Sequence, residues 1–261
     1  MFAATCAFGQ DSSLSLSWLP DQLMMPAFTA NSTAHGVSLT RILKNNQYIG
    51  GMGSMVPVVT ATIHGHEVQF SFGGTVYTQI LRSRNHLEVV NVDFYVDVLA
   101  DYRLDEERIL RFGYGHTSQH FVDDAFEILG YGHSINYVRD YFQSFLLQRI
   151  TAINGYVYGG VLYHYRFKIP QPGAHHWLLE VGGEGLNEEI AKNLFVYLAA
   201  DIKFREESGY ATTQNYQLGL RLRGSTHSLR LALGHRTGIE ERGQFYNQRV
   251  HWNTLGFFFD F

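Results

Sequence analysis

A histidine and a serine two residues apart are the clearest candidates for chemistry in this sequence. The stretch from Arg108 to Ser118 reads R-I-L-R-F-G-Y-G-H-T-S, and His116 and Ser118 lie at its end. In a β-strand, residues i and i+2 point to the same face, with Cα atoms about 6.5 Å apart. An imidazole at that distance can take the proton of a serine hydroxyl, provided that a third group orients the ring. If this stretch is a strand, the pair predicts a serine nucleophile.

The two faces of this predicted strand differ in polarity. One face carries Leu110, Phe112, Tyr114, His116 and Ser118, and the other carries Ile109, Arg111, Gly113, Gly115 and Thr117. The first face is therefore apolar until it ends in the reactive pair. Which substrate the pair can reach depends on whether this face meets protein or hydrocarbon, and the rest of the chain decides that question.

Composition excludes several classes of protein. Of 261 residues, 17% are charged and 15% aromatic, with 26 glycines and five prolines, which favours β-structure over disorder. The net charge of -4 provides no basic surface, so we expect no nucleic-acid partner. No apolar run approaches the roughly 18 residues of a transmembrane helix, which excludes a helical membrane protein but leaves a membrane barrel open.

Alternating hydrophobicity recurs along the chain. Apolar side chains occupy every second position between residues 88 and 101, and similar alternation occurs at 68–76, 216–223 and 228–234. The opposite faces of the strands carry Asp93, Asp97, Arg111, Glu180, Asp201, Lys203, Arg221, Arg223 and Arg230. A soluble sandwich would expose these charges to water. A membrane barrel would enclose them, where opposite charges pair across strands, and would turn the apolar faces to lipid.

Loop lengths favour the barrel. Twelve strands are predicted, at 36–50, 55–63, 66–81, 87–102, 107–119, 133–149, 155–168, 175–185, 193–206, 213–223, 227–237 and 248–261. Most of their connections alternate between tight turns and longer polar loops, with 186–192 as the exception. This alternation is typical of an all-β, antiparallel transmembrane barrel with short periplasmic turns and longer extracellular loops. We therefore expect a bacterial outer-membrane location.

The two ends of the chain fit this interpretation. Residues 1–9 resemble the end of a signal peptide, with Ala7 and Gly9 in a small-x-small pattern, and the single cysteine, Cys6, falls inside it. Residues 10–35 have little periodicity and are expected to be irregular before a single barrel domain at 36–261. The last strand places alternate apolar residues up to Phe261 on one face, which resembles the signal recognised by the outer-membrane assembly machinery.

Around the His-x-Ser pair, the sequence resembles outer-membrane phospholipase A and the outer-membrane lipid A deacylases. Both families are barrels with a lipid-facing His-x-Ser and a third polar residue on the next strand. The resemblance implies His116 as the general base and Ser118 as the nucleophile, with Asn136 or Glu127 orienting the imidazole. Independently of the resemblance, Arg139 and Tyr137 are candidates for contacting the substrate or its oxyanion, with backbone N–H groups as the alternative for the oxyanion. The resemblance covers about residues 108–145.

A wider resemblance covers most of the chain. The segments W-L-P-D…P-A-F-T-A, G-H-T-S-Q-H-F-V-D-D and I-N-Y-V-R-D-Y are similar to an uncharacterised family of bacterial outer-membrane barrels, a domain of unknown function. This resemblance implies the barrel but no particular activity. It places the site among His116, Ser118, His120, Asp123, Asp124, Asn136 and Arg139.

Other interpretations of these residues remain open. His116, His120 and Asp123 could instead bind a divalent metal, and Asp123 and Asp124 could hold Ca²⁺ beside the pair. His116 could also sit at headgroup level without catalysing anything. In the predicted strand 133–149 the alternation is ambiguous, because one parity turns Arg139 to lipid and the other turns Asp140. A β-bulge near Asn136 would resolve it.

Two functions from different classes follow. The first is an outer-membrane hydrolase of the serine type that cleaves acyl esters of a membrane lipid or lipopolysaccharide. The second is a non-catalytic barrel that acts as a narrow pore, binds a solute or scaffolds other envelope proteins. A soluble periplasmic β-domain is a third possibility. The sequence does not fix the oligomeric state.

Overall fold

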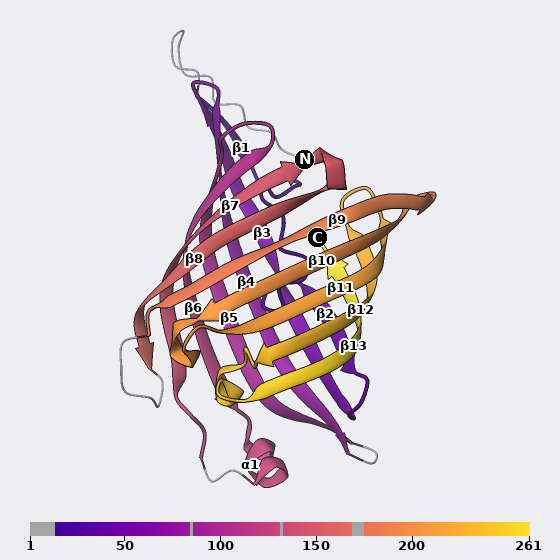
Figure 1. The fold of residues 1–261 in the computed structure, drawn as a ribbon. Coiled ribbons are helices and arrows are strands. Elements are labelled where there is room, and N and C mark those ends of the chain that lie inside the picture. Colours follow the sequence, from indigo (N-terminus) through magenta and orange to yellow (C-terminus); the bar gives the residue numbers. More distant parts are fainter. Residues whose placement is uncertain (1–13, 84–85, 131–132, 169–174) are drawn as a thin grey trace.

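The computed structural model describes residues 14–83, 86–130, 133–168 and 175–261, which form thirteen strands and one α-helix (Figure 1). The strands are β1 Leu14–Trp18, β2 Val37–Ile42, β3 Gln47–Ile63, β4 His66–Ser83, β5 His86–Arg103, β6 Arg108–Phe121, β7 Tyr137–Ile150, β8 Gly155–Lys168, β9 Trp177–Ala191, β10 Leu194–Arg205, β11 Ala211–Arg223, β12 Ser228–Ile239 and β13 Arg249–Asp260. The helix α1 spans Asp123–Leu129, and 3-10 turns occupy Thr151–Ile153, Glu206–Ser208 and Gly243–Phe245. No helix in these ranges is long and apolar enough to cross a membrane. The expected leader, residues 1–9, lies outside them.

Twelve of the strands close into a barrel. Each strand from β2 to β13 pairs antiparallel with the next, and β13 pairs back onto β2. The extra strand β1 pairs with the far half of β3, from Leu14 opposite Ile63 to Trp18 opposite Val59, beyond the reach of the short β2. This confirms the predicted all-β antiparallel barrel of about twelve strands.

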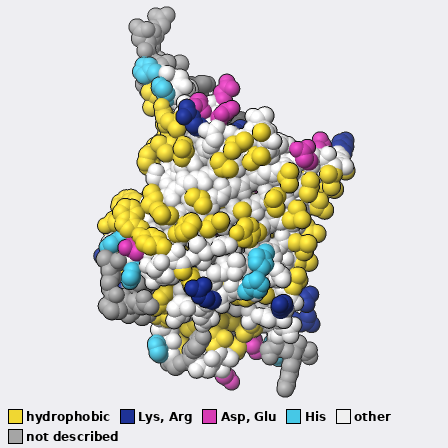
Figure 2. Space-filling view, in the orientation of Figure 1, with side chains coloured by type: hydrophobic (Ala, Val, Ile, Leu, Met, Phe, Trp, Pro, Cys, Tyr) yellow, Lys and Arg dark blue, Asp and Glu magenta, His cyan; other side chains and the backbone are white. Residues whose placement is uncertain are grey.

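The alternation seen in the sequence separates the outside of the barrel from its lumen. Large apolar side chains on the outside are about half exposed, among them Val98, Phe112, Leu218, Leu231 and Phe257. Figure 2 shows hydrophobic side chains spread over the middle of one face, with most of its charged side chains toward the two ends. The inward charges pair across strands as expected; examples are Arg111–Asp101 at 2.6 Å, Arg221–Glu184 at 2.6 Å and Arg230–Asp260 at 2.7 Å.

Two connections differ from the prediction. The first turn lies at residues 43–46, so β2 is short and β3 long, whereas the sequence suggested a turn at the glycine-rich residues 51–54. The segment 186–192, expected as an irregular exception, is mostly strand: β9 continues to Ala191 with register shifts, and the turn is made at Lys192 and Asn193. Asn193 has a positive φ of 61°, which suits a tight turn. The turns after β3, β5, β7, β9 and β11 therefore lie at one end, whereas the turn at 43–46 lies at the end that carries α1 and the longer loops.

The chain between β1 and β2, residues 19–36, runs through the lumen, and we call it the inner segment. Its backbone is held by inward side chains: Met24 N–H donates to Gln69 Oε1 at 2.6 Å, and Arg111 donates to the carbonyl oxygen of Met25 at 2.9 Å. Its apolar side chains form a small core with the barrel wall, comprising Met24, Met25, Phe28, Ile109, Phe145, Leu147 and Tyr158. The sequence predicted an irregular segment here but not its position inside the barrel.

Candidate functional site

Strand β6 presents the predicted pair on the outside of the barrel. Thr117 and Gln119 are buried on its inner face, so the intervening residues His116, Ser118 and His120 point outward. The stretch that the sequence predicted as a strand is one, and it ends on the same side as α1 (Figure 1). The pair therefore lies near the rim that carries the longer loops.

His116 faces Asp140 on the adjacent strand β7. The two residues are directly opposite in the register, and His116 Nδ1 lies 2.6 Å from Asp140 Oδ1. The imidazole is 41% exposed and the carboxylate 10% exposed. Because an ionised carboxylate only accepts hydrogen bonds, Nδ1 carries the proton, and Nε2 of the neutral ring keeps its lone pair. This arrangement prepares His116 to act as a base through Nε2.

Ser118 lies between two histidines along the same strand. Its hydroxyl is hydrogen-bonded to His120 Nε2 at 2.7 Å, rather than to His116. The His120 ring in turn lies near Phe94 on β5, with ring centroids 6.2 Å apart. Both histidines are two residues from the serine, so either ring can approach its hydroxyl from the same face. His116 is the one with the Asp140 carboxylate as orienting partner.

The alternation of β7 continues without the expected bulge near Asn136, because its register with β6 is unbroken from Tyr137 to Gln148; a bulge lies instead on the next strand, β8. Asp140 pairs with Arg166 of β8, whereas Tyr141 pairs with His164, so Tyr165 is the extra residue. On β7 the parity therefore continues unbroken: Asp140 points outward and Arg139 inward. Arg166 lies opposite Asp140 on the outer face, and its Nη1 is 4.0 Å from Asp140 Oδ2.

The structure places the other orienting candidates away from His116. Asn136 is exposed and precedes the first residue of β7, and Glu127 is exposed on α1. The position directly across from His116 belongs to Asp140, because that is where the β6–β7 register places it. Sequence reasoning had considered Asp140 only for its parity. The periodicity of the sequence could not show that Asp140 pairs with His116, because this pairing depends on the register between the two strands.

Arg139 and Tyr137, expected to contact the substrate or its oxyanion, lie inside the barrel. The hydroxyl of Tyr137 donates to the Glu207 carboxylate at 3.0 Å, and the Arg139 guanidinium forms an ion pair with the same carboxylate. Arg139 also stacks over the Tyr137 ring, 4.7 Å from its centroid. This corrects the expectation, because both side chains are on the opposite face of the sheet from Ser118.

The metal candidates are not brought together by the described side chains. His120 bonds to Ser118, and Asp123 and Asp124 form the start of α1, where only their backbone is described. Within the described residues, no group of three or more histidine, cysteine, aspartate or glutamate side chains could hold a metal ion. The Ca²⁺ hypothesis therefore stays a prediction.

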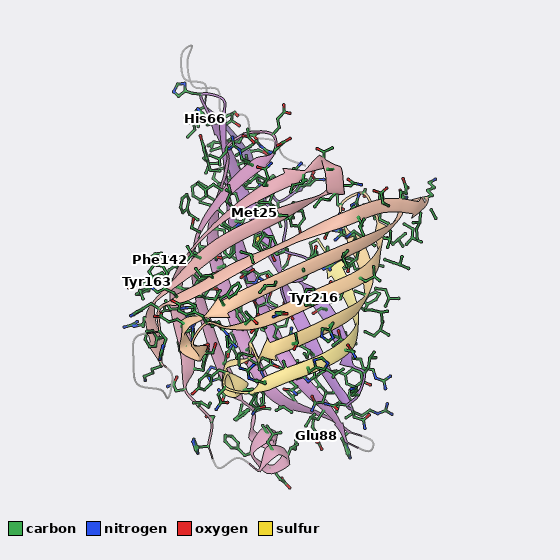
Figure 3. The ribbon with its side chains drawn as sticks, viewed as in Figure 1. Met25, His66, Glu88, Phe142, Tyr163 and Tyr216 are labelled. Carbon is green, nitrogen blue, oxygen red and sulfur yellow. The ribbon has the colours of Figure 1, made fainter. Side chains whose placement is uncertain are left out.

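Aromatic side chains cover the sheet on the side of His116 that faces the middle of the barrel wall. Tyr114 lies 5.8 Å from Phe142 and 6.3 Å from Tyr165, measured between ring centroids, and Phe142 lies 5.2 Å from Tyr165. Figure 3 shows Phe142 and Tyr163 at the outer edge of the sheet, pointing away from the lumen. We call Tyr114, Phe142, Tyr163 and Tyr165 the aromatic patch. Its exposed rings offer an apolar surface directly beside the polar residues.

Comparisons with known proteins support the fold. No family model and no curated protein matches the chain. Among solved structures, it is similar to the outer membrane phospholipase of Salmonella typhi, crystallised as a dimer with bound calcium, with 13% identity and a TM-score of 0.55 over 86% of this chain and 89% of that one. It is also similar to outer membrane phospholipase A from Escherichia coli, with 13% identity and a TM-score of 0.54 over 86% and 91% of the two chains. The chain thus has the barrel fold of these phospholipases.

Proposed function

We propose that this protein is an outer-membrane enzyme that hydrolyses acyl esters of membrane lipids on the outside of its barrel. Ser118 is the nucleophile, His116 the general base and Asp140 the group that orients His116. The observation that carries the proposal is the 2.6 Å hydrogen bond between His116 and Asp140 on the apolar outer face, beside a serine. A carboxylate, an imidazole and a hydroxyl are the three components that serine-type acyl transfer requires.

The location follows from the same surface. The outside of the barrel is apolar and its charges are enclosed, which is the arrangement that a lipid bilayer imposes on a membrane barrel. The similarity to outer membrane phospholipases supports the outer membrane as that bilayer. In this setting, the acyl chain of a lipid lies against the aromatic patch, and its ester reaches the level of His116 and Ser118.

The reaction consists of two acyl transfers. His116 Nε2 takes the proton of the Ser118 hydroxyl as Oγ attacks the ester carbonyl carbon. The tetrahedral intermediate expels the lipid alcohol, which receives that proton, and the acyl group stays on Oγ. Water, deprotonated by the same nitrogen, then attacks the acyl-enzyme and releases a fatty acid. Asp140 stabilises the imidazolium in both steps.

In this mechanism, the hydrogen bond from Ser118 to His120 has to give way to one from Ser118 to His116. In the structure the hydroxyl bonds to His120, so a rotation about χ1 of Ser118 is needed to reach His116. Catalytic hydrogen bonds are often long or poorly aligned in free enzymes and tighten only when substrate is bound. We assign the base to His116 because only this histidine has the Asp140 carboxylate as a partner.

Acyl release from a radiolabelled phospholipid in neutral-detergent micelles tests the proposal. Ser118→Ala should abolish release while the barrel keeps its heat-modifiable migration on gels. Ser144→Ala is the matched control, because Ser144 lies opposite Phe112 on the outer face, farther from the histidines. Unchanged release by Ser118→Ala would remove the serine mechanism, and loss of release in both variants would point to damaged folding.

A further inference from the structure

Two rows of side chains cross three strands on the outer face at the proposed site. In the register, His116 of β6 lies opposite Asp140 of β7, which lies opposite Arg166 of β8. One step closer to the rim, Ser118 lies opposite Val138, which lies opposite Lys168. Directly paired residues share a face of the sheet, so both rows point outward. Each row thus ends in a cation.

The cations of these rows are free to bind a ligand. The side chain of Arg166 is 79% exposed, and its 4.0 Å approach to Asp140 is longer than a direct charge-assisted hydrogen bond. Asp140 is instead bonded to His116, at 2.6 Å. Lys168 is exposed and takes part in none of the ion pairs formed among the described residues. The guanidinium and ammonium donors therefore face outward beside the serine.

Apolar and charged groups succeed one another along the strands. Toward this rim, the aromatic patch comes first, then the row of His116 and Arg166, and then the row of Ser118 and Lys168. This is the order of groups in a membrane lipid: acyl chain, ester and charged headgroup. Long basic side chains at the edge of the apolar zone direct their charges to the headgroup region.

We propose that Arg166 and Lys168 form a binding site for a lipid phosphate and select substrates whose headgroup carries a net negative charge. The selection of a substrate rests on the proposed function, whereas the binding site itself does not. Two strand spacings of about 4.8 Å separate Ser118 from Lys168. A glycerolipid separates its ester from its phosphate by only a few bonds, so one molecule can occupy both places. Guanidinium suits phosphate because it donates two parallel hydrogen bonds.

Lipid binding is measured first, with ether lipids that cannot be hydrolysed. Native mass spectrometry from neutral detergent gives the affinity for dialkyl phosphatidylglycerol and dialkyl phosphatidylcholine. A basic residue near a membrane surface changes affinity for anionic lipid about fivefold, so Arg166→Gln and Lys168→Gln should each weaken phosphatidylglycerol binding by about that factor. Phosphatidylcholine binding should weaken less, because its choline cation offsets the charge of its phosphate. Arg249→Gln is the matched control, because Arg249 is an exposed arginine near the same rim, on β13.

In the second part of the experiment, the rates of hydrolysis of the corresponding diacyl lipids are measured. The double variant Arg166→Gln/Lys168→Gln should lose the preference for phosphatidylglycerol, so that its rates on the two lipids become similar. Heat-modifiable migration on gels shows whether the double variant is folded. A preference that survives in the double variant, in binding or in rate, overturns the inference. If neither lipid is hydrolysed in a Ser118-dependent way but binding depends on the two cations, the proposed function fails and the phosphate site stands.

Discussion

His116 and Asp140 face each other across β6 and β7 on the outside of the barrel, with 2.6 Å between Nδ1 and Oδ1. Charged groups on the lipid face of a barrel are destabilising by an amount that grows with depth in the membrane. An aspartate here offers the fold no advantage over an apolar residue. A carboxylate that fixes the tautomer of an adjacent histidine is what the proposed hydrolysis requires.

Asp140→Asn should show whether Asp140 contributes to catalysis or only to the fold. The amide can still accept a hydrogen bond, but it carries no charge to stabilise an imidazolium and no longer dictates which nitrogen is protonated. We expect kcat for acyl release to fall by about 10²- to 10⁴-fold, the usual contribution of general acid–base catalysis. Folding, followed by heat-modifiable migration, should be unchanged. An Asp140→Asn enzyme with wild-type kcat would show that the carboxylate has no part in the chemistry.

The two histidines beside Ser118 should respond differently to substitution. His116→Ala removes the proposed base, so acyl release should fall to the level of Ser118→Ala. His120→Ala removes the hydrogen bond that holds the serine in the free protein, so release should be retained or increase. Steady-state kinetics on both variants provides the measurement. The reverse result would transfer the role of base to His120 and leave His116–Asp140 as a structural pair.

The sequence allowed the strands and their faces to be predicted, because alternation with a period of two appears directly in residue order. It did not reveal the partner of His116. Asp140 follows 24 residues later, beyond a loop and a helix, and only the register brings the two together. Arg166 depends in addition on the bulge at Tyr165. The inner segment has no periodicity, because its amides bond to side chains of several strands rather than to one ladder.

The inner segment is fixed by a buried ion pair whose loss should be costly. Arg111 donates to both oxygens of Asp101, at 2.6 and 2.7 Å, and to the Met25 carbonyl oxygen, and both charged side chains are almost fully buried. Asp101→Ala leaves the guanidinium buried without its partner, so the free energy of unfolding in urea should fall by about 3–5 kcal/mol. Glu67→Ala, which breaks a partly exposed pair with Arg103, should cost about 1 kcal/mol or less. Equal losses in the two variants would contradict this account.

A carboxylate in the loop after β12 should make stability depend on acidic pH. Burial by itself would raise the pKa of Glu240, but the charges of Arg242 and Arg236 outweigh it and lower the pKa to about 2. Because the folded pKa lies below the ordinary value, Glu240 contributes stability above about pH 4.5 and loses it as the pH falls toward 2. Glu240→Gln should therefore be less stable than wild type in urea at pH 6. The difference should shrink toward pH 2, and a constant difference would contradict the shift.

The lumen should not conduct ions while the inner segment is in place. Residues of this segment bond to several walls of the barrel: Asn31 Nδ2 donates to Glu180 at 2.8 Å, Lys203 donates to Asn31 Oδ1 at 2.9 Å, and His35 Nε2 lies 2.7 Å from Asp97. We therefore expect wild-type protein in planar bilayers to show no steady current. Deleting residues 20–35 should open a channel lined by the freed charges. Open-channel current from the wild-type protein would favour the pore over the enzyme, because it would show that the inner segment does not block the lumen.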